Sequence, residues 1–400
     1  RDIQLRKNLL IACIIHGPQA EIPSGVAGTV DFSDDVTLAA PAANAGKTTI
    51  VSEGTAAAPV AKITVDKAGD KLTVNGKVTA NGNYAIAGNG SKTAGNIDSC
   101  DITVNEGAVI SAPNGIAIYH PEKGTVTING GEISGHTGIE LCAGKLVVSG
   151  GSITSTGNNV DATGSQNAIL DGAAISIINR NYPGGTPTAE ITGGTIKATG
   201  EGAQTVKAYD YTNNEVATWT DAGAHVNISG GTFSSIPDNM DALCADGYVP
   251  VKNADGYAVQ TGTYVASIGT KKFASLAEAI EAAPRNATVK LLADTKENVT
   301  ISTPYVTLDL NGHTLNGSTG ERKPALTITA RVTVKDSSEA QTGTIMREDT
   351  AENSGVSSHY VIDIQGNAWV MFESGNVRNN SGNVKGKGAS LVRVGDDSVD

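Results

Sequence analysis

Short runs of alternating apolar and polar residues recur along the chain, and each is followed by a pair of small residues. In TVTI at 125–128, Val126 and Ile128 are the apolar members and Thr125 and Thr127 the polar ones. Because successive side chains of a strand point to opposite sides, this alternation predicts strands with one face in a core and the other in solvent. Glycine accepts a positive φ without a Cβ clash, so the small pair predicts a corner where the chain turns.

The corner belongs to a six-residue motif, apolar-x-small-small-x-apolar, that is repeated along the chain. Its copies are VNEGAV at 104, INGGEI at 128, VSGGSI at 148, LDGAAI at 170, ITGGTI at 191 and ISGGTF at 228, with a looser copy, FESGNV, at 372. The starts from 104 to 191 lie 24, 20, 22 and 21 residues apart, a period typical of one turn of a parallel β-helix. We therefore predict an all-β fold, a right-handed parallel β-helix solenoid, in preference to an antiparallel β-sandwich, which needs hairpins at shorter and irregular spacing.

The last step of the series, from 191 to 228, is 37 residues long and contains AYDYTNNEVATWTDAG. The extra residues predict a loop that protrudes from one turn of the solenoid. The loop from Tyr209 to Trp219, which also carries Tyr211, is our preferred contact element, because exposed Tyr and Trp side chains anchor partners. The alternative is that these aromatic side chains pack the loop down onto its own turn.

The pattern departs from strands at FASLAEAIEAA, residues 273–283, where apolar residues share one helical face. Ser275 followed by Glu278 is a capping box, and Pro284 ends the helix. A single helix before further strand-like runs predicts a cap on a second β-helix. We thus expect two units in series: a cap or irregular segment at 1–60, a first β-helix at 61–262, and a second β-helix at 263–400 that is truncated in LVRVGDDSVD.

Charge and composition exclude several classes of partner. The formal net charge of −12 weighs against nucleic acid, and no apolar run is long enough to insert into a membrane. The six histidines and four cysteines are scattered without CxxC or HxxxH spacing, so we predict no metal site and no cofactor. Buried thiols and one or two disulfides both remain open for Cys13, Cys100, Cys142 and Cys244.

Several segments carry a resemblance to a known group of proteins. FASLAEAIEAA, VKLLAD and VTLDLNGHTL, together with ISGGTF and DGYVPVKNADGYAV between 228 and 259, resemble the repeat-rich surface proteins of Gram-positive commensal bacteria. The resemblance covers residues 100–400 and implies a pectate-lyase-like β-helix architecture, display at the cell surface or secretion, and an adhesion-type role. It carries over no functional residue. Residues 1–60 lie outside it, which leaves open a phage fibre or decoration protein on a virion surface.

Aligning the repeats by their glycine pairs predicts which side chains share a face. The two inward columns are Ile116, Ile139, Val160, Val206 and Ile118, Leu141, Ala162, Ala208, and the outward row between them is Ala117, Glu140, Asp161, Lys207. With Glu140 and Asp161 one turn apart, their carboxylates lie about 5 Å from each other, the spacing that a retaining glycosidase uses. If the chain is a polysaccharide-active enzyme, a glycosidase or a lyase, its catalytic residues are Glu140, Asp161 and Lys207.

The same face offers ligand-binding candidates that need no chemistry, namely Tyr119, Glu140, Asp161, Lys207, Tyr209, Asp210, Tyr211 and Trp219. Outward positions of any solenoid are polar, and sugar-cleaving grooves carry more aromatic rings than the 4% of this chain supplies. A lyase also needs an acidic calcium cluster, which neither Arg180 nor Lys207 has beside it. We therefore expect a non-enzymatic extracellular adhesin-like or structural protein that presents a binding face or spacer, with a glycan or a host-surface protein as partner.

Overall fold

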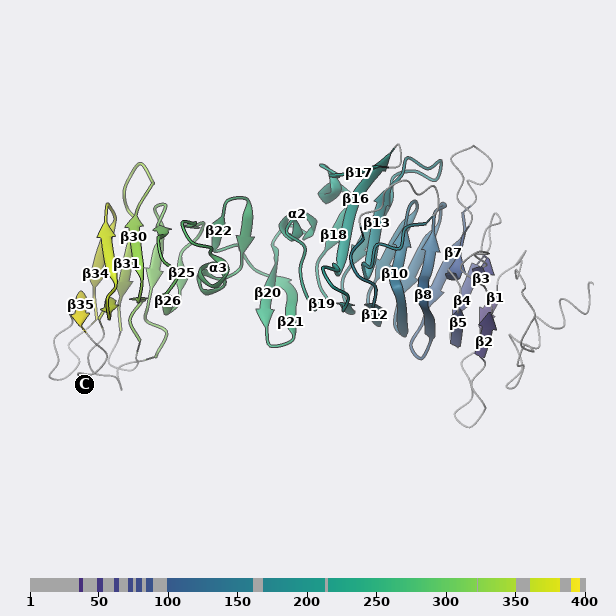
Figure 1. The fold of residues 1–400 in the computed structure, drawn as a ribbon, viewed down its shortest axis with the longest axis horizontal. Helices are drawn as coiled ribbons and strands as arrows, with labels where there is room; N and C mark the ends of the chain where they lie inside the picture. The colour runs from purple at the N-terminus through teal and green to yellow at the C-terminus, as the bar shows by residue number, and fades with distance from the viewer. Residues whose placement is uncertain are drawn as a thin grey trace, which may run out of the picture. The chain divides into compact units, whose positions relative to one another are not determined.

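The computed structural model describes residues 99–160, 168–212, 215–321, 323–349, 360–381 and 390–395, and before them the short segments 36–38, 49–52, 61–64, 71–74, 77–80 and 84–88. These residues form an all-β protein in which most strand pairs are parallel (Figure 1). The chain separates into two compact units. The first comprises Arg1–Tyr248 and Asn253–Gln260, and the second Val249–Lys252 and Thr261–Asp400.

The described strands up to Thr261 form two sheets. The seven-stranded sheet contains, in order, β1 (Val36–Leu38), β4 (Lys71–Val74), β7 (Asp101–Val104), β9 (Thr125–Ile128), β11 (Lys145–Val148), β14 (Thr188–Ile191) and β18 (Val226–Ile228). The fourteen-stranded sheet contains β2 (Thr49–Ser52), β3 (Ala61–Thr64), β5 (Lys77–Ala80), β6 (Tyr84–Ala87), β8 (Val109–His120), β10 (Glu132–Leu141), β12 (Ser152–Ser155), β13 (Ile175–Asn179), β15 (Thr195–Ala198), β16 (Val206–Thr212), β17 (Glu215–Ala217), β19 (Thr232–Phe233), β20 (Tyr248–Asn253) and β21 (Gly256–Thr261). Two short helices, η1 (Ala222–Ala224) and α2 (Met240–Leu243), lie between β17 and β20.

The glycine motif makes the corner between these two sheets, as predicted. Five copies each join a strand of the seven-stranded sheet to one of the fourteen-stranded sheet, and their fourth residues have φ between 79° and 93°: Gly107, Gly131, Gly151, Gly194 and Gly231. The apolar residues that flank each corner, such as Ile128 and Ile133, are buried in the core of the first unit. At these corners the alternation of the sequence therefore identifies the inward side chains correctly.

Replacing Gly151 with alanine is expected to lower the free energy of unfolding of the first unit by about 2 kcal/mol more than replacing Gly247. The two glycines have φ of 79° and 77°, so alanine strains both backbones equally. An added Cβ at Gly151 lies 2.7 Å from the carbonyl oxygen of Gly130, whereas at Gly247 no described atom lies within 4 Å. Urea unfolding followed by Trp219 fluorescence, in a Trp369→Phe background, measures both. Equal losses would show that stacking at the corner contributes nothing beyond backbone strain.

One copy of the motif, LDGAAI at 170, is not such a corner. Leu170 is 36% exposed, and β11 pairs directly with β14 in the register Lys145↔Thr188. This repeat therefore runs from 145 to 188, about twice the length of its predecessors, and most of its additional residues lie between β12 and β13, with the others between β13 and β14. The prediction of a regular period through 170 is wrong, because an insertion there happens to contain a motif-like stretch.

The predicted outward and inward columns hold only in part. Pairing of β10 with β13, and of β13 with β16, aligns Ile139 with Val206 and Leu141 with Ala208, as predicted. Val160 is 50% exposed and lies outside the column, where Ile175 stands instead, and Ala162 is outside the described residues. Ile118 pairs with Ile139 rather than Leu141, because the register of β8 against β10 shifts between Gly135 and Thr137.

The second unit contains three further sheets. The six-stranded sheet has the order β23 (Lys271–Phe273), β22 (Ala266–Ile268), β24 (Thr288–Leu291), β27 (Val306–Asp309), β30 (Arg331–Lys335), β33 (Trp369–Phe372). One four-stranded sheet contains β25 (Thr295–Lys296), β28 (Thr314–Asn316), β31 (Thr344–Arg347) and β34 (Asn376–Asn379), and the other contains β26 (Val299–Ile301), β29 (Leu326–Ile328), β32 (Ile362–Gln365) and β35 (Val392–Gly395). All pairs are parallel except those that β22 makes with β23 and β24.

The helix predicted at 273–283 is confirmed as α3 (Leu276–Ala282), although Phe273 ends the preceding strand. The Ser275 Oγ accepts the Glu278 N–H at 3.1 Å, which is the hydrogen bond from the N-cap side chain in the predicted capping box. Leu276 and Ile280 are buried in the core of the second unit. The segment predicted as a cap or irregular at 1–60 contains strands β1 and β2, which pair in parallel with β4 and β5, and its other residues lie outside the described ones.

Candidate functional site

Half of the predicted site residues meet in a second, smaller core on the outer face of the fourteen-stranded sheet. We call it the outer cluster; its buried apolar members are Ala87, Ile116, Tyr119, Cys142, Ala143, Ile169, Ile178, Tyr182, Tyr209 and Tyr211. Along the end of β10 and the residue that follows it, the side chains alternate, so that Ile139 and Leu141 enter the main core while Glu140 and Cys142 enter the outer cluster. Ile169, from the insertion between β12 and β13, covers this face.

Glu140 lies at the centre of the outer cluster and is fully buried. Its Oε2 accepts the Ile169 N–H at 2.7 Å, and its Oε1 accepts the Cys142 thiol at 3.3 Å. Burial, followed by the nearby charge of Asp171, raises the pKa of Glu140 to about 8. At neutral pH this carboxyl is therefore mostly protonated.

Asp171 is the second buried carboxyl of the outer cluster. Its Oδ2 accepts the Ser176 hydroxyl at 2.5 Å and the Tyr209 hydroxyl at 3.1 Å, and its Oδ1 accepts the Ala173 N–H at 3.0 Å. The Thr137 hydroxyl donates to Oδ1 at 3.4 Å. Asp171 thereby ties the inserted segment to β13 and β16, and burial raises the pKa of Tyr209 well above its ordinary value.

Arg180 supplies the positive charge of the outer cluster. Its Nη1 lies 3.8 Å from Glu140 Oε1, and its guanidinium carbon lies 5.3 Å and 4.9 Å from the ring centroids of Tyr182 and Tyr211. The residue is 2% exposed. The two rings face the positive charge of Arg180, and these cation–π contacts stabilise the buried cation.

The prediction that Tyr119, Tyr209, Tyr211 and Trp219 are exposed contact residues is wrong. Their exposed fractions are 8%, 4%, 0% and 4%. Tyr211 continues β16 and pairs with Val216 of β17, so the residues predicted as a protruding loop form an antiparallel hairpin. Trp219 stacks on His225 with ring centroids 5.2 Å apart. The alternative, in which the aromatic side chains pack onto the protein, holds.

The remaining predicted residues lie at the margin of the outer cluster or outside the described chain. Lys207 occupies the same row as Glu140, as predicted, with Ser176 between them, and its Nζ donates to Asn159 Oδ1 at 2.8 Å. Asp210 Oδ1 accepts the Asn179 amide at 2.8 Å. Asp161 lies outside the described residues, so the predicted pair of Glu140 with Asp161 is not described. The prediction that Glu140 faces solvent is wrong, because the insertion covers it.

Sequence reasoning missed Asp171 as the acidic neighbour of Glu140. Asp171 lies in the LDGAAI copy of the motif, and the regular spacing of the copies predicted that this copy forms a corner. Two signals identify it as different: its fourth residue is Ala173 instead of the glycine of the five corners, and the regular copies on either side, at 148 and 191, are already separated by two periods. A buried pair of carboxyls beside tyrosines resembles an acid–base site in composition, yet a polysaccharide reaches these oxygen atoms only if the covering segment moves.

Other sequence predictions concern metals, thiols and membranes. Within the described part of the chain, no three His, Cys, Asp or Glu side chains are grouped closely enough to hold a metal ion. Cys100, Cys142 and Cys244 are not joined to one another by a disulfide, and Cys13 lies outside the described residues. None of the described helices has the length and hydrophobicity needed to span a bilayer.

Two hollows lie on solvent-facing sides of the sheets. One, of about 370 Å³, is lined by Leu72, Thr73, Asp101, Thr103, Thr125 and Thr127 of the seven-stranded sheet. The other, of about 480 Å³, lies on the sheet of β28, β31 and β34 and is lined by residues that include Asp294, Thr314, Asn376 and Arg378.

Comparison of the chain with protein families, with curated proteins and with solved structures gave no match.

Proposed function

We propose that the chain is a non-enzymatic, extracellular right-handed parallel β-helix protein that presents a binding face or a spacer at a surface. The observation that supports it best is the parallel, in-register pairing of strands over both units, from β1 through β18 and from β24 through β33. Such stacking sets outward side chains at a constant spacing of about 4.8 Å on long, flat faces. The resemblance to repeat-rich surface proteins of Gram-positive commensal bacteria supports display at the cell surface or secretion.

The burial of the acidic pair favours binding over catalysis. Glu140 and Asp171 are both fully buried, and their oxygen atoms are engaged by Ile169, Ser176 and Tyr209. A glycosidase needs its two carboxyls on either side of an accessible glycosidic bond. We therefore assign this pair to the stability of the first unit and place ligand binding on the solvent-facing sheets.

The test is binding of the purified chain to an array of glycans and host-surface proteins, scored for retained ligand and for cleaved product. Retained, uncleaved ligand supports the proposal. Cleaved glycan, with cleavage abolished by Glu140→Gln, would replace it with a polysaccharide-active enzyme. If a chain shown to be folded retains no ligand, the result favours a spacer or a phage fibre. A trimer in solution would then distinguish the fibre from the spacer.

A further inference from the structure

An alternating ladder of arginine and aromatic side chains lies on the outer face of the six-stranded sheet. The guanidinium carbon of Arg285 lies 4.2 Å from the ring centroid of Tyr305, and that of Arg331 lies 5.4 Å from the same centroid and 4.3 Å from the ring centroid of Trp369. Arg331 and Trp369 are directly paired residues of β30 and β33. Tyr305 is 41% and Trp369 43% exposed, so the ladder faces solvent.

The ladder places two positive charges beside one aromatic ring, that of Tyr305. Both guanidinium carbons lie within 5.4 Å of the Tyr305 ring centroid, so the two cations repel each other. Among the described residues, no carboxylate forms an ion pair with Arg285 or Arg331. A guanidinium stacked on a ring still presents the N–H groups of its edge. The face therefore offers two fixed donors for an anion that the described part of the protein does not supply.

Two lysines add to the charge of the same face. Lys290 of β24 and Lys335 of β30 point outward, because their strand neighbours are in the core, and neither forms an ion pair with a described residue. Asp309 lies between them in the register. The residue is 3% exposed and its Oδ1 accepts the N–H groups of Asn311 and Ser337, so it is not presented to solvent. Exposed Glu373 follows Phe372 in the register of β30 with β33 and offsets part of this charge, so the face keeps a smaller excess of positive charge in a chain whose net charge is −12.

We propose that this face binds an anionic polysaccharide, of the class that carries a carboxylate on its sugar units. The proposal rests on the proposed function, for which it names the face and the class of ligand. Arginine pairs with carboxylate through two parallel hydrogen bonds, and basic groups repeated from strand to strand match acid groups repeated along a polymer. The exposed ring of Trp369 provides an apolar surface for the C–H face of a sugar. A nucleic acid is also a polyanion and is repelled by the acidity of the whole chain to the same extent, so the test compares the two ligands directly.

The test uses the full chain with an oligogalacturonate as the probe. Binding is measured by calorimetry and, in a Trp219→Phe background, by the fluorescence of Trp369. Arg331→Gln is expected to weaken binding about tenfold, the loss of one charge-assisted hydrogen-bonding group. Arg378→Gln removes the same charge from β34, on another sheet, and is expected to change the affinity less than about twofold. A neutral oligosaccharide of the same length, polyglutamate and single-stranded DNA are the comparison ligands.

The outcomes separate this inference from the proposed function. Oligogalacturonate binding that is weakened by Arg331→Gln and not by Arg378→Gln supports both. Equal affinity in all three proteins, or stronger binding of polyglutamate or DNA than of the uronate, overturns the inference. If the uronate does not bind while the array retains another glycan or a host protein, the inference fails and the proposed function stands. If the array retains nothing and the uronate does not bind, the inference fails together with the binding-face form of the proposed function, and a spacer or a phage fibre is left.

Discussion

Replacing Arg347 with methionine is expected to lower the free energy of unfolding of the second unit by about 3–5 kcal/mol, because it leaves a buried carboxylate without its counter-ion. Arg347 is 1% exposed. Its Nε donates to Asp349 Oδ2 at 2.7 Å and its Nη2 to Oδ1 at 3.1 Å, a two-point contact. The same guanidinium donates to the carbonyl oxygens of Lys323 and Glu321.

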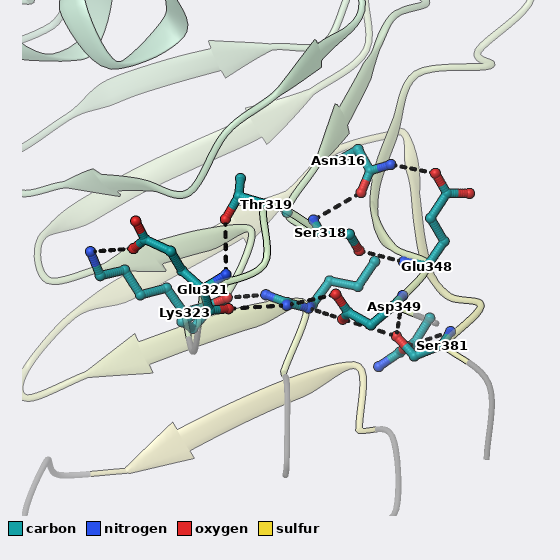
Figure 2. A network of polar contacts seen from close by, with 12 residues as sticks. Asn316, Ser318, Thr319, Glu321, Lys323, Glu348, Asp349 and Ser381 are labelled. Atoms are coloured by element: carbon teal, nitrogen blue, oxygen red, sulfur yellow. Dashed lines mark hydrogen bonds and ion pairs between the residues drawn. The ribbon is translucent and has the colours of Figure 1, made fainter. Parts of the chain in front are cut away.

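The surrounding contacts explain why the loss is large. In Figure 2, Asp349 lies beside Ser381, and Ser318 beside Glu348. The Asp349 N–H donates to Ser381 Oγ at 3.1 Å, and the Glu348 N–H donates to Ser318 Oγ at 2.7 Å. The ion pair thus belongs to a polar network that links segments from three successive strands, β28, β31 and β34. Removal of its cation affects all of them.

The measurement is urea unfolding followed by the fluorescence of Trp369 in a Trp219→Phe background, which leaves one tryptophan, in the second unit. Arg378→Gln, an exposed arginine on β34, is the matched control and is expected to change stability by less than about 0.5 kcal/mol. The double variant Arg347→Met/Asp349→Leu is expected to be more stable than Arg347→Met alone, because neither charge stays buried. A double variant as unstable as the single one would contradict a cost that arises from the unpaired carboxylate.

Local patterns predicted the strands and corners well. Alternation in TVTI identified Val126 and Ile128 as core residues, and the glycine motif marked the corners, since both depend on residues within a few positions of each other. The capping box before Leu276 identified a helix of only seven residues. These features need no knowledge of what lies across the fold.

The outer cluster was not predictable from the period. The alternation assigns Glu140 correctly to the side of the strand away from the main core, but it does not show that another segment covers that side. The covering residue, Ile169, comes from an insertion whose LDGAAI stretch imitates the repeat. The repeat period therefore predicted Tyr209 and Tyr211 as exposed, whereas the structure buries both, because burial depends on contacts between distant parts of the chain. The same reason kept the ladder of Arg285, Tyr305, Arg331 and Trp369 out of the sequence prediction.

Raising the pH from 6.5 to 8 is expected to destabilise the first unit, and Glu140 is the group responsible. Its pKa is raised from an ordinary 4.5 to about 8 in the native state. Between these values the unfolded chain releases the proton while the native protein keeps it, so stability is full below pH 4.5 and falls as the pH rises toward 8. The slope is at most about 1.4 kcal/mol per pH unit.

The window above pH 6.5 separates this effect from that of a buried histidine. Burial lowers the pKa of His120 from 6.5 to about 4. Its contribution to stability is therefore present above pH 6.5 and is lost as the pH falls toward 4, the opposite direction. Above pH 6.5 the imidazole is largely neutral in both states, and Glu140 dominates the difference.

Urea unfolding of a Trp369→Phe protein, followed by Trp219 fluorescence at several pH values from 6.5 to 8, measures the slope. Glu140→Gln removes the titrating group and keeps the size of the side chain, so its stability is expected to depend less on pH than that of the parent. The control is Glu132→Gln, an exposed residue of the same strand, β10, which is expected to keep the parental slope. Equal slopes in the two variants would mean that the proton on Glu140 is not held in the native state, and that the insertion carrying Asp171 does not seal this face from water.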